Sequence, residues 1–337
     1  MRIPRALVGA AVLFAATTSQ AASQVIPGPN GPVEFIGLQK WDAQRLFDAI
    51  RELDPDRPFH ACAAVMKMDL GFADAAAFSY MTGFSADSER YTVVVGVEDS
   101  SGVRYRRAGS ETLVLPETWE NLKTLVSEDM ATVDAAAQTL HASDDQAREF
   151  AGFMGADPET LARVRHLVRG ANGEEDRRLA HEVLARDSAR WARAAATLVL
   201  GNFIDDDRSW HALAGSLIDS QTRVRTVASG ILTGLILQKP DPVDWSGARG
   251  ALSALFGGTN PFAFRDMLGV LSLTGIDPEF GQQLLRENPD LLLAHAGAEH
   301  ERTRGTALTF LKVVSGEDFG TDVEAWTAWV KGGVGGR

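Results

Sequence analysis

The sequence predicts a mainly α-helical protein, in which a small N-terminal α+β domain precedes a C-terminal array of antiparallel helix pairs. Two observations lead to this fold class. Strand-like alternation is confined to the chain before Pro116. After it, the pattern of residues 187–201 returns 32 residues later in residues 219–235, and a period of this length is typical of stacked helical repeats.

Charge and cysteine content limit the classes of partner. The chain has 337 residues and a net charge of −12, and residues 22–156 hold 21 acidic against 11 basic side chains. Such a surface repels phosphate groups, so we expect no nucleic-acid partner and no anionic membrane surface. The single cysteine, Cys62, excludes an internal disulfide and a multi-cysteine zinc site. Its helical spacing with Phe59 and Met66 predicts a buried thiol rather than a reactive one.

Residues 1–21 have the pattern of an export signal. Arg2 and Arg5 open the segment, an apolar run covers residues 6–16, and small residues allow cleavage between Ala21 and Ala22. The run is shorter than the ~20 residues that span a bilayer, and no later segment is a credible transmembrane helix. We therefore expect a periplasmic or secreted protein whose mature chain is not inserted in a membrane.

Residues 22–34 are interpreted as a linker because they are rich in proline and glycine. The small α+β domain is predicted over residues 35–115, with two helices and about three antiparallel strands. The helices are expected at residues 41–53 and 59–70, and the strands at 75–81, 91–97 and 103–107, with 113–115 as a possible addition. Arg104, Arg106 and Arg107 are interpreted as protection of a sheet edge, with an anion site as the alternative.

Residues 116–170 are predicted to be a helical connector, and residues 171–316 to hold the repeats. Asp187 aligns with Asp219, and Arg193 aligns with Arg225, six residues further on in both copies. A shorter helix is expected before each copy. Since one such helix pair cannot bury both of its faces, neighbouring pairs must stack.

This arrangement resembles the HEAT-repeat family, whose units are two antiparallel helices with an aspartate at the turn and an arginine six residues later. The resemblance implies an α-solenoid. It also implies that the repeated arginines are structural and bond to turn groups, rather than forming a basic ladder for a polyanion.

Two looser units are expected under the same resemblance, with Arg265 and Arg304 as their arginines. Their turn positions are occupied by Thr259 and Ala298 instead of aspartate. Asn260 and Glu299 are adjacent to these positions and are candidates to replace the missing acids.

Residues 317–331 resemble the segment that closes such arrays. Phe319, Trp326 and Trp329 are expected to cover the open end of the last unit, with an aromatic ligand site as the alternative. Residues 332–337 are expected to be a disordered tail.

No motif in the sequence indicates catalysis. A nucleophile elbow, a phosphate loop and a paired-histidine metal motif are all missing, so we assign no catalytic residue, cofactor or metal. Asp205, Asp206 and Asp207 are interpreted as helix-capping residues rather than calcium ligands.

The leading hypothesis is an exported, non-enzymatic scaffold that presents the helical array to a protein or peptide partner. The candidate protein-binding residues lie off the apolar stripe of the second helices: Arg190, Arg223, Thr226 and Ser229. One alternative is an enzyme, lyase-like or hydrolytic, with a site between the α+β domain and the array. Another is a structural envelope component that self-associates.

Overall fold

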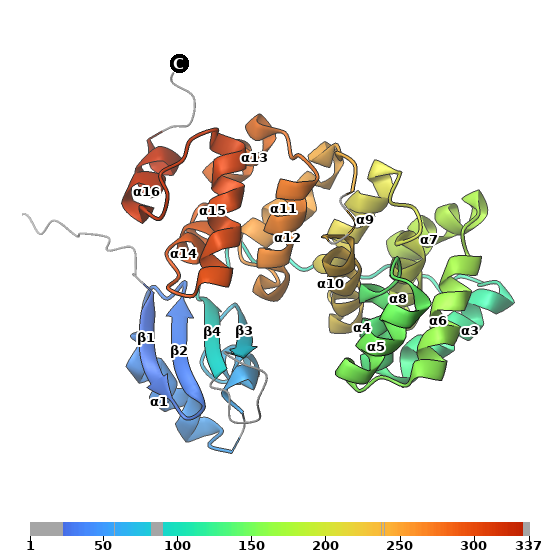
Figure 1. Cartoon of the computed structure of the whole chain (residues 1–337), viewed down its shortest axis with the longest axis horizontal. Coiled ribbons are helices and arrows are strands. Elements are labelled where there is room, and N and C mark those ends of the chain that lie inside the picture. The colour runs from blue at the N-terminus through green and yellow to red at the C-terminus, as the bar shows by residue number, and fades with distance from the viewer. Residues whose placement is uncertain (1–22, 57, 82–89, 237, 239, 333–337) are drawn as a thin grey trace, which may run out of the picture.

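The computed structural model describes residues 23–332, apart from residues 57, 82–89, 237 and 239. The predicted export signal and most of the predicted tail lie outside the described residues. The described chain forms sixteen α-helices and one four-stranded sheet (Figure 1). The mainly α-helical class with a small N-terminal α+β part is thus confirmed. No helix among the described residues is both long and apolar enough to cross a membrane.

The sheet contains β1 (Gln24–Gly28), β2 (Gly31–Ile36), β3 (Asp74–Met81) and β4 (Arg90–Val97), in the order β1-β2-β4-β3. Neighbours β1 and β2 are antiparallel, as are β3 and β4, but β2 runs parallel to β4. The sheet is therefore mixed, and the prediction of a purely antiparallel sheet is wrong. The segments 103–107 and 113–115 are not strands of the sheet. Arg106 bonds through its backbone to Ile218 and Ser220, and the Leu113 N–H donates to the Asp187 side chain.

The prediction of a linker at residues 22–34 is also wrong, because this segment contains β1 and part of β2. Pro27 lies on an edge strand, where a missing N–H is tolerated. Pro32 precedes Val33, which is the first residue of β2 that pairs with β4. In the turn between the strands, Gly31 has a φ of 123°, and a Cβ there would lie 2.5 Å from the Arg90 carbonyl oxygen. Only glycine fits this turn.

The two faces of the sheet have different partners. Three short helices cover one face: α1 (Ala43–Leu53), the 3-10 helix η1 (Phe59–Ala61) and α2 (Ala63–Met68). Phe35 and Val94 point to that side and share a core with Leu46 of α1. On the opposite face, Ile36 and Val93 join the large core of the helical part. The sheet is therefore the middle layer between its own helices and the rest of the molecule.

Four helices follow the sheet, as the predicted connector requires: α3 (Glu117–Glu128), α4 (Met130–Gln138), α5 (Asp144–Met154) and α6 (Pro158–Gly170). Their starts follow from local chemistry. Asp129 accepts the N–H of Ala131 at the start of α4, and Ser143 forms a capping box with Gln146 in α5.

The remaining chain forms four helix pairs, which we number one to four: α7 (Glu174–Arg186) with α8 (Arg190–Leu200), α9 (Asp207–Leu217) with α10 (Thr222–Ile236), α11 (Arg249–Phe256) with α12 (Pro261–Leu273), and α14 (Asp290–Ala296) with α15 (Glu301–Ser315). The short helix η2 (Trp245–Ala248) precedes α11, and α13 (Pro278–Glu287) lies between pairs three and four. The second helices α8, α10, α12 and α15 each contact the next one (Figure 1).

The last helix, α16 (Val323–Lys331), packs on α13 and α14. Its Trp326 is fully buried, and its ring centre lies 4.7 Å from that of Phe319 and 6.2 Å from that of Trp329. These aromatic rings cover apolar surface of the final helices, as a terminal cap would.

Candidate functional site

Residues 98–116 connect β4 to α3 and run along the turns inside the helix pairs; we call this segment the strap. It meets the turns in reverse order. The Arg104 N–H donates to Thr259 Oγ1 in pair three over 2.7 Å. Arg106 then bonds through its backbone to the turn of pair two, and Glu111 to the turn of pair one. The strap therefore ties three successive helix pairs together.

The first two turns use their own aspartates. Asp187 accepts the N–H of Ala189 over 2.7 Å and that of Leu113 in the strap over 3.0 Å. Asp219 receives two hydrogen bonds from Arg193, of 3.0 and 3.1 Å, and both side chains are fully buried. Burial alone would raise the pKa of Asp219, but the bonds from Arg193 and a turn N–H lower it below its usual value. Asp219 is thus an ionised, structural carboxylate.

The third and fourth turns lack an aspartate, and the sheet supplies the carboxylates. Asp74 of β3 accepts the N–H of Asn260 over 2.9 Å. Glu34 of β2 accepts the N–H groups of Glu299 and His300 over 2.5 and 3.0 Å. Both carboxylates are almost completely buried. Asn260 and Glu299 therefore do not replace the missing acids; their backbones are donors to acids from another part of the chain.

Three of the four repeat arginines share one geometry. The Nη1 atoms of Arg193, Arg225 and Arg304 each donate to the carbonyl oxygen six residues earlier, over 3.0, 2.6 and 2.8 Å. The guanidinium groups therefore close the turns from inside the following helix. These contacts agree with a structural role for the three arginines and give no basic ladder for a polyanion.

Arg265 departs from this geometry. Its Nη1 donates to the Tyr80 hydroxyl over 2.6 Å, and its Nη2 to Asp266 over 2.6 Å. The guanidinium also lies 5.3 Å from the ring centre of Phe78, which stacks on the half-exposed Phe262. Arg265 therefore ties α12 to β3 instead of closing its own turn.

Two of the predicted protein-binding residues come together around one ring. The guanidinium carbons of Arg190 and Arg223 lie 4.5 and 5.0 Å from the ring centre of Trp191. In the described part of the chain neither guanidinium has a hydrogen bond or ion pair, and Nη1 of Arg223 is buried. Burial and the neighbouring charge of Arg190 lower the pKa of Arg223.

The other two predicted residues are less accessible. Thr226 is half-buried, and its hydroxyl donates to the Thr222 carbonyl oxygen. Ser229 is only 8% exposed, so its expected surface position is wrong. The physical reason is that α10 is covered by α4 as well as by its neighbours α8 and α12.

Much of the surface that the sequence left open for a partner is occupied by the chain itself. Helices α3 and α4 pack on α8 and α10, and β3 packs on α12. The contact of α4 with α10 is close, since a Cβ at Gly234 would lie 2.3 Å from the Gln138 carbonyl oxygen. Amphipathic periodicity shows that a helix has an apolar face but not which distant segment covers it, so sequence reasoning missed this contact.

No group of three His, Cys, Asp or Glu side chains among the described residues could hold a metal ion. Cys62 is buried, and burial raises the pKa of its thiol to about 12, so the predicted burial of the thiol is confirmed. His295 is fully buried, and burial lowers its pKa to about 4.

A cavity of about 250 Å³ lies between the end of the sheet, the start of the strap and the loops after α11 and α13. Its described lining includes four acidic residues: Glu98, Asp99, Glu287 and Asp290. Three of them are already engaged. Glu98 accepts three backbone N–H groups, Asp99 is bonded by Ser101, and Glu287 pairs with Arg249. Only Asp290 remains as a candidate for acid–base chemistry there.

The interpretation of the strap arginines as protection of a sheet edge is wrong, because residues 103–107 do not belong to the sheet. The alternative, an anion site, is not assembled either. Arg106 pairs with the buried Asp219 over 3.2 Å, while Arg104 and Arg107 are exposed. Comparison of the chain with protein-family models, with curated proteins and with solved structures finds no match. A function for this chain therefore has to be argued from its own residues and their geometry.

Proposed function

We propose that the protein is an exported, non-enzymatic scaffold built on a HEAT-like α-solenoid, and that it binds a protein or peptide partner. The repeat architecture is supported by the shared turn geometry of Arg193, Arg225 and Arg304. The succession of contacts from α8 to α15 supports stacking of the pairs. Export to the periplasm or beyond is supported by the pattern of residues 1–21.

The observation that carries the binding surface is the cluster of Arg190, Trp191, Arg223 and Thr226. Two guanidinium groups share one indole ring, and no carboxylate of the described chain bonds to them. Burial and the charge of Arg190 disfavour the charged form of Arg223, and Asp129 opposes these effects only in part, since the pKa of Arg223 is still lowered. An acidic group from a partner would relieve the remaining repulsion. Tryptophan and arginine also carry much of the binding energy in protein interfaces. The partner that fits is a protein with an exposed acidic segment.

The test is recovery of a partner from an envelope extract on the immobilised full chain. The double variant Arg190→Ser/Arg223→Ser removes both charges from the cluster, and we expect at least about a tenfold loss of recovery. The matched control is Arg163→Ser/Arg302→Ser, which removes two exposed charges elsewhere. Loss with the first variant and not with the control supports the surface. Equal recovery with both would rule out this assignment, and no partner with the unmodified chain would rule out the scaffold function.

The cavity between the sheet and the helical pairs favours a second candidate, a hydrolytic or lyase-like enzyme. Its volume of about 250 Å³ approaches that of small-molecule sites, and Asp290 is its unengaged carboxylate. Turnover of ester or glycoside substrates that disappears in Asp290→Asn would support this candidate. Turnover that survives the substitution would place the chemistry elsewhere.

A further inference from the structure

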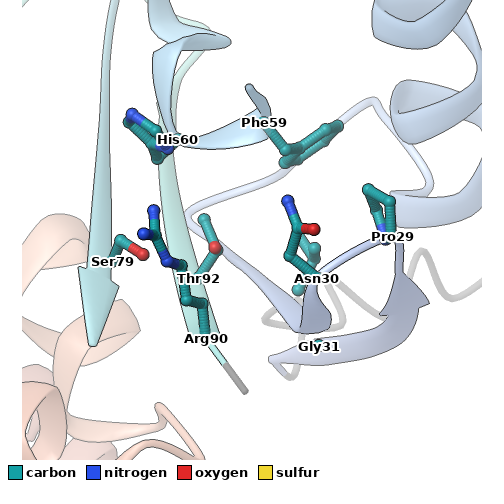
Figure 2. Close-up of a pocket in the computed structure, with 9 residues that line it drawn as sticks. Pro29, Asn30, Gly31, Phe59, His60, Ser79, Arg90 and Thr92 are labelled. Atoms are coloured by element: carbon teal, nitrogen blue, oxygen red, sulfur yellow. The ribbon is translucent and has the colours of Figure 1, made fainter. Parts of the chain in front are cut away.

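A small polar hollow lies at the edge of the core between the sheet and η1 (Figure 2). Its walls come from three parts of the chain: the turn between β1 and β2, the start of η1, and the adjoining ends of β3 and β4. The enclosed part measures about 10 Å³, which is room for one water-sized atom. Phe59 and Pro29 form an apolar rim on one side (Figure 2).

Five polar side chains converge on this hollow. Ser79 and Thr92 lie directly opposite each other in the β3–β4 register. Arg90 precedes Thr92 by two residues and therefore points to the same side of the sheet. Figure 2 shows the guanidinium of Arg90 directed toward His60 of η1, with the amide of Asn30 across the opening.

These side chains offer several hydrogen-bond donors that no acceptor of the described chain takes up. Within the described part of the chain, none of the five side chains has a hydrogen bond or an ion pair, and no carboxylate lines the hollow. Guanidinium, amide, imidazole and hydroxyl groups all supply N–H or O–H donors. No carboxylate of the described chain thus pairs with Arg90, which lies in the more acidic half of the sequence, where residues 22–156 hold 21 acidic and 11 basic residues.

We propose that this hollow binds a carboxylate group. One oxygen occupies the enclosed space beside Ser79 and Thr92, and the other faces the planar donors of Arg90, which match the geometry of a carboxylate. The small enclosed volume admits one oxygen atom, whereas a phosphate group would have to place three oxygen atoms around a single guanidinium. The rim of Phe59 and Pro29 contacts an apolar stem next to the carboxylate. Such a group comes either from a free organic acid or from the C-terminus of a peptide.

Isothermal titration calorimetry on the full chain tests this proposal. The probes are sodium acetate and the peptide acetyl-Ala-Ala-Leu, with either a free or an amidated C-terminus. We expect the free acid of the peptide to bind and the amide to fail. Binding of acetate as well assigns the site to free acids in general, and binding of the peptide alone assigns it to C-termini. The proposal is overturned if the free-acid and amidated peptides bind equally well. It is also overturned if neither acetate nor the free-acid peptide binds.

Variants locate the binding. Arg90→Gln should weaken it at least about tenfold, since a charge-assisted pair is lost. Thr92→Val keeps the size of the side chain and should weaken it several-fold. Arg107→Gln, an exposed arginine of the strap, is the charge-matched control and should leave it unchanged. Thermal unfolding checks that each variant is folded. If the Arg90→Gln variant does not fold, the Thr92→Val variant still tests the site. Binding that is the same in the folded variants and the control refutes the site.

Discussion

Replacing Glu34 by glutamine should loosen the N-terminal sheet from the fourth helix pair. The Glu34 side chain is fully buried, and its carboxylate accepts the N–H groups of Glu299 and His300 as well as the hydroxyls of Tyr91 and Ser23. Burial and the neighbouring Glu34 carboxylate raise the pKa of Tyr91, so its hydroxyl keeps its proton and donates.

The size of the effect follows from the arrangement of these donors. Each oxygen of Glu34 receives one backbone N–H and one hydroxyl. Glutamine turns one oxygen into an NH₂ group, which must face a donor whichever way the amide is placed. The hydroxyl can rotate away, but the backbone N–H cannot. Hydrogen bonds to charged groups contribute about 1.5–3 kcal/mol each, and a buried donor without a partner adds its desolvation cost. We therefore expect a loss of about 3–5 kcal/mol in the free energy of unfolding.

Urea unfolding of the full chain measures the loss, and hydrogen exchange of the Glu299 and His300 amides shows where it occurs. Glu98→Gln is the matched control. Glu98 also accepts backbone N–H groups, but those of Gln39, Lys40 and Trp41 within the N-terminal part. The Glu98→Gln variant should lose less stability than Glu34→Gln and leave the Glu299 and His300 amides protected from exchange. A Glu34→Gln variant that loses less than about 1 kcal/mol, with both amides still protected, would refute the reasoning.

Two further predictions concern buried charge. Asp219→Asn leaves the buried guanidinium of Arg193 without its paired carboxylate and should cost about 3–5 kcal/mol in urea unfolding, whereas the exposed Asp205→Asn should cost little; equal losses would contradict the structural role of Asp219. The pKa of His295 is about 4 in the folded chain, below its value of about 6.5 in the unfolded chain, so protonation of His295 favours unfolding. The contribution of His295 to the free energy of unfolding should therefore be complete above pH 6.5 and fall by about 3 kcal/mol as the pH approaches 4. A smaller fall in His295→Leu is the check, and an identical pH profile would disprove the assignment.

Periodicity was sufficient to predict most of the helices, because each helix carries its own apolar face and start signals. The four connector helices appear where the pattern after Pro116 placed them. The aspartates at 187 and 219 do mark turns, and three of the four repeat arginines bond as expected.

Other features depend on distant parts of the chain and leave no local signal. The prolines of β1 and β2 resemble those of a linker, yet Pro27 is tolerated because its strand is an edge. Glu34 and Asp74 have no sequence mark as turn ligands, since their donors are 265 and 186 residues away. The polar hollow leaves no local signal for the same reason: His60 of η1 is distant in the sequence from Arg90 and Thr92 of β4, and only the fold brings them together.

The reverse order in which the sheet and strap meet the helix pairs has a consequence for chain growth. Glu34 is synthesised 265 residues before Glu299, a delay of roughly 10–50 s at ordinary rates of elongation. Until then its carboxylate has no turn to bind, and the helix-facing side of the sheet lacks the part of its cover that pair four provides. The last helix pair therefore completes the fold of the first strands, and contacts of such long sequence separation are slow to form. A chain that stops before Ala298 would carry a finished sheet sequence without the turn whose N–H groups bind Glu34.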